Sequence, residues 1–290
     1  MKTLGKLIAC WLVYGVSILV TGIVAHLFHL SAVNMHNPAP PATQFLTACA
    51  SAAILVIGLW PLASGLTAPA AWRAAAIGSF LLLALGVNGL IETAKFSHFL
   101  DTGLGTAIVL YIAMAVLLGS ALGLQFGSAG SPAGFPHHNW PSWLWRGIVA
   151  WLGWPPIYLV FGMCAAPVVV PYYQAGVAGL HIPPMSLILE MQLIRSVLFL
   201  AASLPLIALW RGSRRSLWLS LGLAHAFTVG IYGLVGAWFF PVALRIAHSI
   251  EITADSFAYA GLLVLLFTAP KAATASQPAE AKAIPASLSA

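Results

Sequence analysis

Charged side chains are rare in this sequence. Asp, Glu, Lys and Arg make up 6% of its 290 residues, whereas hydrophobic residues make up 61% and the mean hydropathy is +0.96. A soluble globular domain carries about 25% charged residues, which cover the surface that faces water. The shortage of charge therefore excludes a large soluble domain and indicates a protein that lies mainly within a membrane.

Sequence motifs that identify a particular chemistry are also missing. The sequence contains no HExxH, CxxCH or ExxH pattern for a metal or haem, and no P-loop or nucleophile elbow for group transfer. Its three cysteines, Cys10, Cys49 and Cys164, lie within apolar stretches and show neither CxxC nor another metal-binding spacing. We interpret them as small buried hydrophobic residues.

Eight apolar stretches are long enough to cross a bilayer, which requires about 20 residues in a helix. They lie at 7–30, 45–67, 74–93, 103–126, 147–170, 186–210, 216–240 and 246–268. The sequence therefore predicts an all-α polytopic membrane protein with eight transmembrane helices. The first stretch is predicted to be a retained helix rather than a cleaved signal, because Lys6 directly precedes the LIAC sequence at 7–10.

Lysine and arginine are enriched at one side of the predicted bundle. With the N-terminus inside, nine of the twelve basic residues fall on the inner side: Lys2, Lys6, Arg73, Arg146, Arg211, Arg214, Arg215, Lys271 and Lys282. Short cytoplasmic loops carry an excess of Lys and Arg, so both termini are predicted to be cytoplasmic, with the protein in the cell inner membrane. The spread of positive charge along the chain argues against a nucleic-acid partner, which would need a clustered basic surface.

Four landmarks recur in the same order in the two halves of the chain, at offsets between 142 and 150 residues. They are Pro40-Pro41 and Pro183-Pro184, Pro61 and Pro205, Arg73 and Arg215, and the stretches KFSHFLD (95–101) and RIAHSIE (245–251). This recurrence predicts a four-helix unit at 1–126, a cytoplasmic Gly/Pro/Trp-rich linker at 127–146, a second unit at 147–268 and a disordered cytoplasmic tail at 269–290. Four helices per unit make the two units parallel, related by an axis along the membrane normal.

The stretch RIAHSIEITADS at 245–256 concentrates ionisable groups beside an apolar run. In a helix, Arg245, His248, Glu251 and Asp255 lie within about a third of the circumference and form one polar stripe. The other ionisable residues predicted near this level are Glu92, Lys95, His98, Asp101, Glu190 and Arg195. Such groups are costly inside a membrane and usually face a protein interior or a water-filled cavity. We therefore predict an ionisable cavity at the outer leaflet.

Three functions fit these residues; the sequence favours the first and leaves the other two as alternatives. The first is a proton- or ion-coupled transporter of small solutes, in which carboxylates and histidines relay protons. The second is a membrane-embedded metal- or haem-binding protein. Its candidate metal ligands are His98, Asp101, His248 and Glu251. The expected partners are the lipid bilayer and a small ion or solute.

The third function is an enzyme that acts on a lipid-linked substrate at the outer leaflet. Arg245 and Lys95 would hold a phosphate group, and a His–carboxylate pair would act as general base. A less specific function is a structural subunit of a larger membrane complex. Bound metal or haem absorbance in a purified sample would favour the second function over the other two.

Two further features have a structural interpretation. His225 lies in the middle of the seventh predicted helix without a charged neighbour, and we expect it to bond a backbone carbonyl. Tyr172 and Tyr173 are predicted to anchor the protein at the membrane interface. These three residues are therefore left out of the predicted site.

Overall fold

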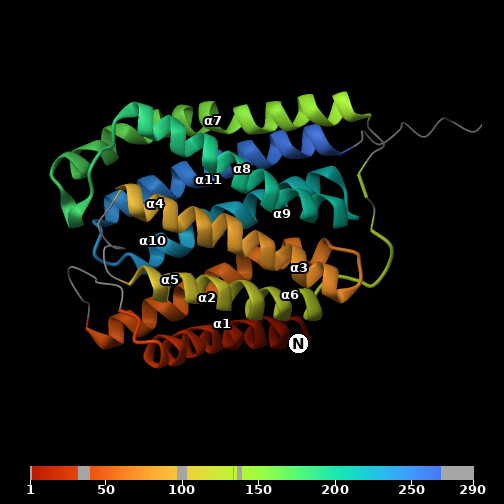
Figure 1. The fold of residues 1–290 in the computed structure, drawn as a ribbon, viewed down its shortest axis with the longest axis horizontal. Coiled ribbons are helices and arrows are strands. Elements are labelled where there is room, and N and C mark those ends of the chain that lie inside the picture. Colours follow the sequence, from red (N-terminus) through yellow and green to blue (C-terminus); the bar gives the residue numbers. More distant parts are fainter. Residues whose placement is uncertain (1, 32–39, 97–102, 133, 136–138, 269–290) are drawn as a thin grey trace, which may run out of the picture.

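The computed structural model describes residues 2–31, 40–96, 103–132, 134–135 and 139–268. Within these residues, eight helical spans are long and apolar enough to cross a membrane: Lys2–Leu27, Pro41–Gly65, Ala70–Lys95, Leu104–Gln125, Trp140–Gln174, Met185–Leu209, Arg214–Gly236 and Val242–Phe267. The predicted all-α architecture with eight spans is confirmed, and the protein is an integral membrane protein. Figure 1 shows that the spans run side by side along the long axis of the molecule.

Five spans are single α-helices, and three contain a π-helical segment. The single helices are α1 (Lys2–Leu27), α2 (Pro41–Gly65), α7 (Trp140–Gln174), α8 (Met185–Leu209) and α11 (Val242–Phe267). The divided spans are α3 (Ala70–Phe80), η1 (Leu81–Val87) and α4 (Asn88–Phe96); α5 (Leu104–Ala113), η2 (Met114–Leu118) and α6 (Gly119–Gln125); and α9 (Arg214–Ala226), η4 (Phe227–Ile231) and α10 (Tyr232–Gly236). A 3-10 turn, η3 (Val177–Gly179), follows α7.

The π-helical segments change which side chains face the interior. A π-helix bonds residue i to residue i+5, so it holds more residues per turn than an α-helix and rotates the helix that follows it. Segment η1 directly precedes α4, which carries Asn88 and Glu92, and η4 directly precedes α10, which begins at Tyr232. Such segments occur frequently at functional sites, and both of these adjoin the cavities described below.

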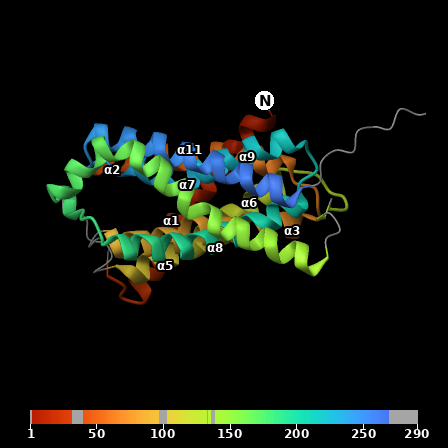
Figure 2. The same cartoon turned by 90° about the horizontal axis from the view of Figure 1, so that it is seen from above.

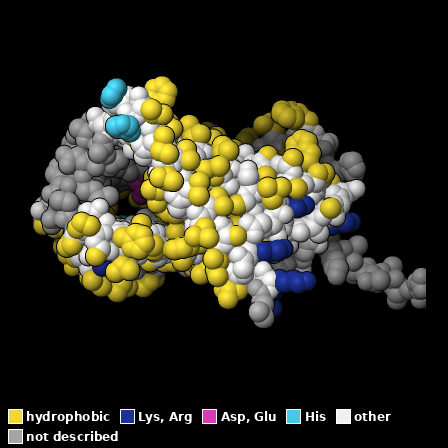
Figure 3. All heavy atoms as spheres, turned by 90° about the horizontal axis from the view of Figure 1, so that it is seen from below, with side chains coloured by type: hydrophobic (Ala, Val, Ile, Leu, Met, Phe, Trp, Pro, Cys, Tyr) yellow, Lys and Arg dark blue, Asp and Glu magenta, His cyan; other side chains and the backbone are white. Residues whose placement is uncertain are grey.

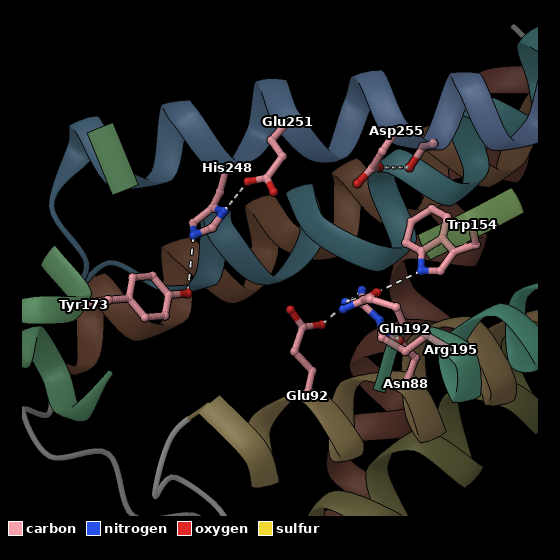
Figure 4. Close-up of polar contacts among 10 residues, drawn as sticks. Asn88, Glu92, Trp154, Tyr173, Gln192, Arg195, His248, Glu251 and Asp255 are labelled. Carbon is pink, nitrogen blue, oxygen red and sulfur yellow. Dashed lines mark hydrogen bonds and ion pairs between the residues drawn. The ribbon is translucent and has the colours of Figure 1, made fainter. Parts of the chain in front are cut away.

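Helix α7 is longer than a bilayer requires. Its 35 residues correspond to about 52 Å, whereas the hydrocarbon core is about 30 Å thick. The Asn139 side chain caps the helix by accepting a hydrogen bond from the Ser142 amide at 3.1 Å. The helix therefore begins at Trp140, so residues 140–146 of the predicted linker are helical. Its far end brings Tyr173 close to α11 (Figure 4).

Small residues allow the third and fourth spans to pack closely. On α6, Gly119 and Gly123 form a GxxxG pattern that faces Ala74 and Gly78 of α3. A Cβ atom on Gly119 would lie 2.7 Å from the Gly78 Cα atom, and one on Gly123 would lie 2.4 Å from the Ala74 nitrogen. The two backbones are therefore in contact, which is the close approach that paired small residues permit in membrane helices.

The remaining spans pack around a shared core. Helix α9 packs on α11, while α7 packs on both α11 and α8 (Figure 2). Between the halves of the chain, α2 contacts α9 and α10, and α8 contacts α3 and η1. The largest buried side chains include Phe80, Phe199 and Tyr259, whose rings surround the imidazole of His225. The second and third helices of each half therefore form the interface with the other half.

Several polar contacts occur as equivalent pairs in the two halves. The Thr67 amide bonds the Leu209 carbonyl at 2.8 Å, and the Arg211 amide bonds the Gly65 carbonyl at 3.3 Å. The two bonds are related by an offset of 144 residues (209 − 65 and 211 − 67). Side-chain bonds to helix-end carbonyls recur at offsets of 140 to 141, from Lys6 to Gln125 and from Arg146 to Leu266. These contacts support the internal repeat, which stays a prediction.

The surface of the molecule separates apolar from basic regions. Large hydrophobic side chains such as Leu12, Val160 and Ile250 are exposed along the spans, as expected for surfaces that contact lipid. Figure 3 shows that most of the visible Lys and Arg side chains gather toward one end of the molecule and the visible His side chains toward the other. This asymmetry agrees with the predicted cytoplasmic termini, although the membrane orientation itself stays a prediction.

Candidate functional site

A small cavity of about 50 Å³ lies among α4, α7, α8, η4 and α11 (Figure 4). It is lined by Glu92, Trp154, Tyr158, Tyr173, Arg195, Val229, His248, Glu251, Ile252 and Asp255. Three carboxyl groups, one guanidinium group and one imidazole thus line one small space inside the membrane-spanning part of the protein. We call this space the charged cavity.

His248 links Tyr173 to Glu251 across the charged cavity. Its Nδ1 atom lies 2.8 Å from Glu251 Oε2, and its Nε2 atom lies 3.4 Å from the Tyr173 hydroxyl. Glu251 follows His248 by three positions, so one face of α11 presents both side chains. When Nδ1–H of His248 donates to the Glu251 carboxylate, the Nε2 atom of a neutral imidazole accepts a hydrogen bond from the Tyr173 hydroxyl. In a cationic imidazole, Nε2–H donates to that hydroxyl instead.

Arg195 organises the opposite wall of the charged cavity. It is 4% exposed, and its Nε atom donates to Asn88 Oδ1 at 2.7 Å. A terminal nitrogen lies 3.6 Å from Glu92 Oε2, whose side chain is 40% exposed. Another terminal nitrogen lies 3.4 Å from Gln192 Oε1, which also accepts from Trp154 Nε1 at 2.9 Å. These contacts connect α8 to α4 and hold the guanidinium group in one position.

Three aromatic rings complete the surroundings of the Arg195 guanidinium group. Its central carbon lies 5.6 to 5.8 Å from the ring centroids of Trp154, Tyr158 and Phe199. The electron-rich faces of such rings attract a cation at these distances, and more strongly where water is excluded. The protein therefore stabilises a buried positive charge beside the three carboxyl groups.

Asp255 is the most deeply buried carboxyl group of the site. It is 3% exposed, compared with 8% for Glu251, which lies one turn before it on the same face of α11. The Ser256 hydroxyl donates to Asp255 Oδ1 at 3.5 Å. Exposure thus falls from Glu92 through Glu251 to Asp255, so the three carboxyl groups form a series from the edge of the cavity to its interior.

The structure does not bring all the predicted site residues to this cavity. Lys95 and Glu190 are exposed, and neither lines it. Arg245 lines a separate, largely apolar groove of about 730 Å³ beside α10 and α11, together with Ser249 and Thr253. Its buried Nε atom has no hydrogen-bond partner. The sequence predicted that Arg245 shares one cavity with Glu251 and Asp255, but in the structure Arg245 lines a different space.

Two predicted residues, His98 and Asp101, lie outside the described part of the chain. Among the described residues, no group of three or more His, Cys, Asp and Glu side chains has the arrangement of a metal site. His248 and Glu251 are the two described members of the predicted ligand set, and they bond each other, so this ligand set stays a prediction.

The sequence analysis did not assign several residues of the charged cavity and its wall to the site, among them Tyr173, Trp154, Tyr158 and Gln192. Gln192 had a detectable signal, because it precedes Arg195 by three residues and so lies on the same face of one helix. The aromatic residues had none, since tyrosine and tryptophan are common at membrane interfaces. Tyr173 was interpreted as such an anchor, yet its hydroxyl contacts His248.

His225 is buried in the bundle but does not line the charged cavity. Its Nε2 atom lies 2.8 Å from the Ser203 hydroxyl, rather than bonding the backbone carbonyl expected from the sequence. The imidazole is buried and packs against the aromatic rings around it. This pair connects α8 to α9 and satisfies both polar groups within the core.

Comparisons with protein-family models, with curated proteins and with solved structures found no match for this chain. The function must therefore be inferred from the residues and their geometry alone.

Proposed function

We propose that this protein is a proton-coupled carrier of small solutes and that the charged cavity is its proton-handling site. The observation that carries the proposal is the hydrogen-bonded Tyr173–His248–Glu251 series, which shares one cavity with Glu92, Arg195 and Asp255. Ionisable residues inside membrane helices are typical of proton relays in pumps and transporters.

The balance of charge supports proton binding by the cluster as a whole. Glu251 and Asp255 are buried, and if both were ionised they would outnumber the single buried guanidinium group by one negative charge. A net charge buried in a membrane protein is costly. Each proton that binds to a carboxylate or to the imidazole lowers this net charge, so the cluster exchanges protons as its surroundings change.

The size of the charged cavity supports a proton, rather than an organic solute, as the species handled there. A cavity of about 50 Å³ has room for water but is well below the roughly 300–1,000 Å³ of typical sites for organic ligands. Such water would connect the carboxyl groups to the imidazole. The solute of the proposed carrier must therefore bind elsewhere.

Transport in proteoliposomes tests this function. Vesicles that contain a pH-sensitive dye are exposed to a panel of uncharged and charged small solutes, with and without an imposed pH gradient. We expect at least one solute to move protons with it through the wild-type protein, and a protonophore to abolish its accumulation. Equal proton movement in wild-type vesicles and in protein-free vesicles for the whole panel would contradict the proposal.

A matched pair of variants assigns the activity to the cavity. Glu251→Gln removes an ionisable group from the charged cavity but keeps its shape, whereas Glu190→Gln makes the same change at an exposed residue that does not line it. We expect Glu251→Gln to abolish coupled proton movement and Glu190→Gln to retain it. Equal activity of the two variants would remove the charged cavity from the mechanism.

A further inference from the structure

A second and larger cavity lies between the two halves of the chain. It has a volume of about 520 Å³ and is bounded by α1, α2, α4, α5 and α10. The polar side chains that line it include Tyr14, Thr47, Ser51, Thr106, Tyr111 and Tyr232. We call it the hydroxyl cavity, because among the described residues that line it none carries a charge.

Ser51 is the strongest sign that the hydroxyl cavity binds a ligand. Its side chain is 3% exposed, lines the cavity, and has no hydrogen-bond partner for its Oγ atom. An unpaired buried hydroxyl group costs about 1–3 kcal/mol, so native proteins rarely retain one without a role. A ligand hydroxyl or carbonyl group would satisfy it.

A preformed tyrosine pair lines the same cavity. The hydroxyl groups of Tyr14 on α1 and Tyr232 on α10 lie 2.8 Å apart, and either can be the donor. The second of these residues begins the helix that follows the π-helical segment η4. The pair thus offers a donor and an acceptor to a ligand that also reaches Ser51, while Leu110, Trp238 and Phe239 supply apolar contacts.

We infer that the hydroxyl cavity binds an uncharged small molecule whose ring or short chain carries a hydroxyl or carbonyl group. A volume of a few hundred cubic ångströms is typical of sites for small molecules. A buried ion would find no opposite charge among the described lining residues, so the cavity excludes charged analogues by the cost of their desolvation.

The position of the hydroxyl cavity relates it to the charged cavity, and this part of the inference rests on the proposed carrier function. Helix α4 contributes Glu92 to the charged cavity and the adjacent Thr93 to the hydroxyl cavity. A rotation or shift of α4 would therefore change both cavities together. The hydroxyl cavity is then the solute site of the carrier, and the charged cavity its proton site.

Three probes with the same ring test the chemistry of the hydroxyl cavity. They are 2-phenylethanol, phenylacetate and 2-phenylethylammonium, which are neutral, anionic and cationic at pH 7. Binding to purified protein in lipid nanodiscs is measured by saturation-transfer NMR, with protein-free nanodiscs as the blank. We expect saturation transfer above the blank for the neutral probe alone.

Variants at Ser51 place the binding in this cavity. Ser51→Leu puts a larger apolar side chain into the hydroxyl cavity and should abolish saturation transfer to 2-phenylethanol. Ser51→Ala removes one hydrogen bond and should weaken binding about fivefold. The control, Ser79→Leu, makes the same change at an exposed serine of α3 and should bind as the wild type does.

The outcomes separate this inference from the carrier function. Equal binding of the three probes, or full binding by Ser51→Leu and by Ser51→Ala, overturns the assignment of the hydroxyl cavity, whatever the proton assays show. Selective binding that Ser51→Leu abolishes supports it. If that binding is found and wild-type vesicles move no more protons than protein-free vesicles do, the carrier function alone is overturned.

Discussion

Replacement of Arg195 by methionine should destabilise the protein more than the loss of a surface arginine does. Methionine has a similar length and no charge, so the change removes the guanidinium contacts with little loss of volume. The largest single effect comes from Asn88, which is buried and loses the donor to its Oδ1 atom. A hydrogen bond to a charged group, such as this one, contributes about 1.5–3 kcal/mol.

The loss of the ion pair between Arg195 and Glu92 adds less to the destabilisation. Its N–O distance is 3.6 Å, and the Glu92 side chain is 40% exposed, so water screens the charge that remains. We assign this pair no more than about 1 kcal/mol. With the contacts to the aromatic rings included, Arg195→Met should cost about 3 kcal/mol. In a chain of this size, this corresponds to a fall in the unfolding temperature of about 6–12 °C.

Unfolding in a defined detergent, followed by tryptophan fluorescence, measures this effect. Arg245→Met is the matched control, because the Nε atom of Arg245 has no partner to lose. A double-mutant cycle of Arg195→Met with Asn88→Leu should show a coupling above about 1 kcal/mol, and a cycle with Glu92→Gln a smaller one. A cost for Arg195→Met no greater than that of the control would refute the reasoning.

Three further outcomes are expected from other parts of the structure. Arg73→Met should cost about 3 kcal/mol, because buried Arg73 donates to three carbonyl groups, whereas Arg215→Met at an exposed residue should cost less than about 0.5 kcal/mol in the same assay. In a cysteine-free background, Ala178→Cys should react with an impermeant thiol reagent from outside the cell and Gly212→Cys only after lysis; the reverse pattern would invert the orientation. Tyr173→Phe should lower coupled proton movement without reducing solute binding, and unchanged coupling would exclude this hydroxyl from the relay.

The eight spans could be predicted because membrane insertion depends on a local property of the sequence. An apolar run of about 20 residues identifies a span whatever its neighbours are. The predicted helix ends were less accurate than the number of spans, because polar capping residues extend the helices beyond the apolar runs. For example, Asn139 starts α7 at Trp140, well before the predicted start at 147. The π-helical segments left no signal in the apolar pattern, because they change the hydrogen bonding without changing the composition.

The candidate site was predictable only where one helix determines it. The helical period places His248, Glu251 and Asp255 on one face of α11, and all three line the charged cavity. The same reasoning included Arg245 at the edge of that face, yet packing against α10 directs it into a different groove. Contacts between helices cannot be obtained from one sequence. This is why the approach of Tyr173 to His248 and the bond from Arg195 to Asn88 were not foreseen.

Infrared difference spectroscopy tests the central claim most directly, since it detects proton binding by carboxyl groups without knowledge of the solute. Spectra of the purified protein in lipid are recorded during pH changes, and the carbonyl band of protonated carboxyl groups is followed. We expect Glu251→Gln to remove or shift part of the wild-type band and Glu190→Gln to leave the pH response of buried carboxyl groups unchanged. Identical difference spectra for the wild type and Glu251→Gln would contradict the assignment of the charged cavity as a proton-handling site.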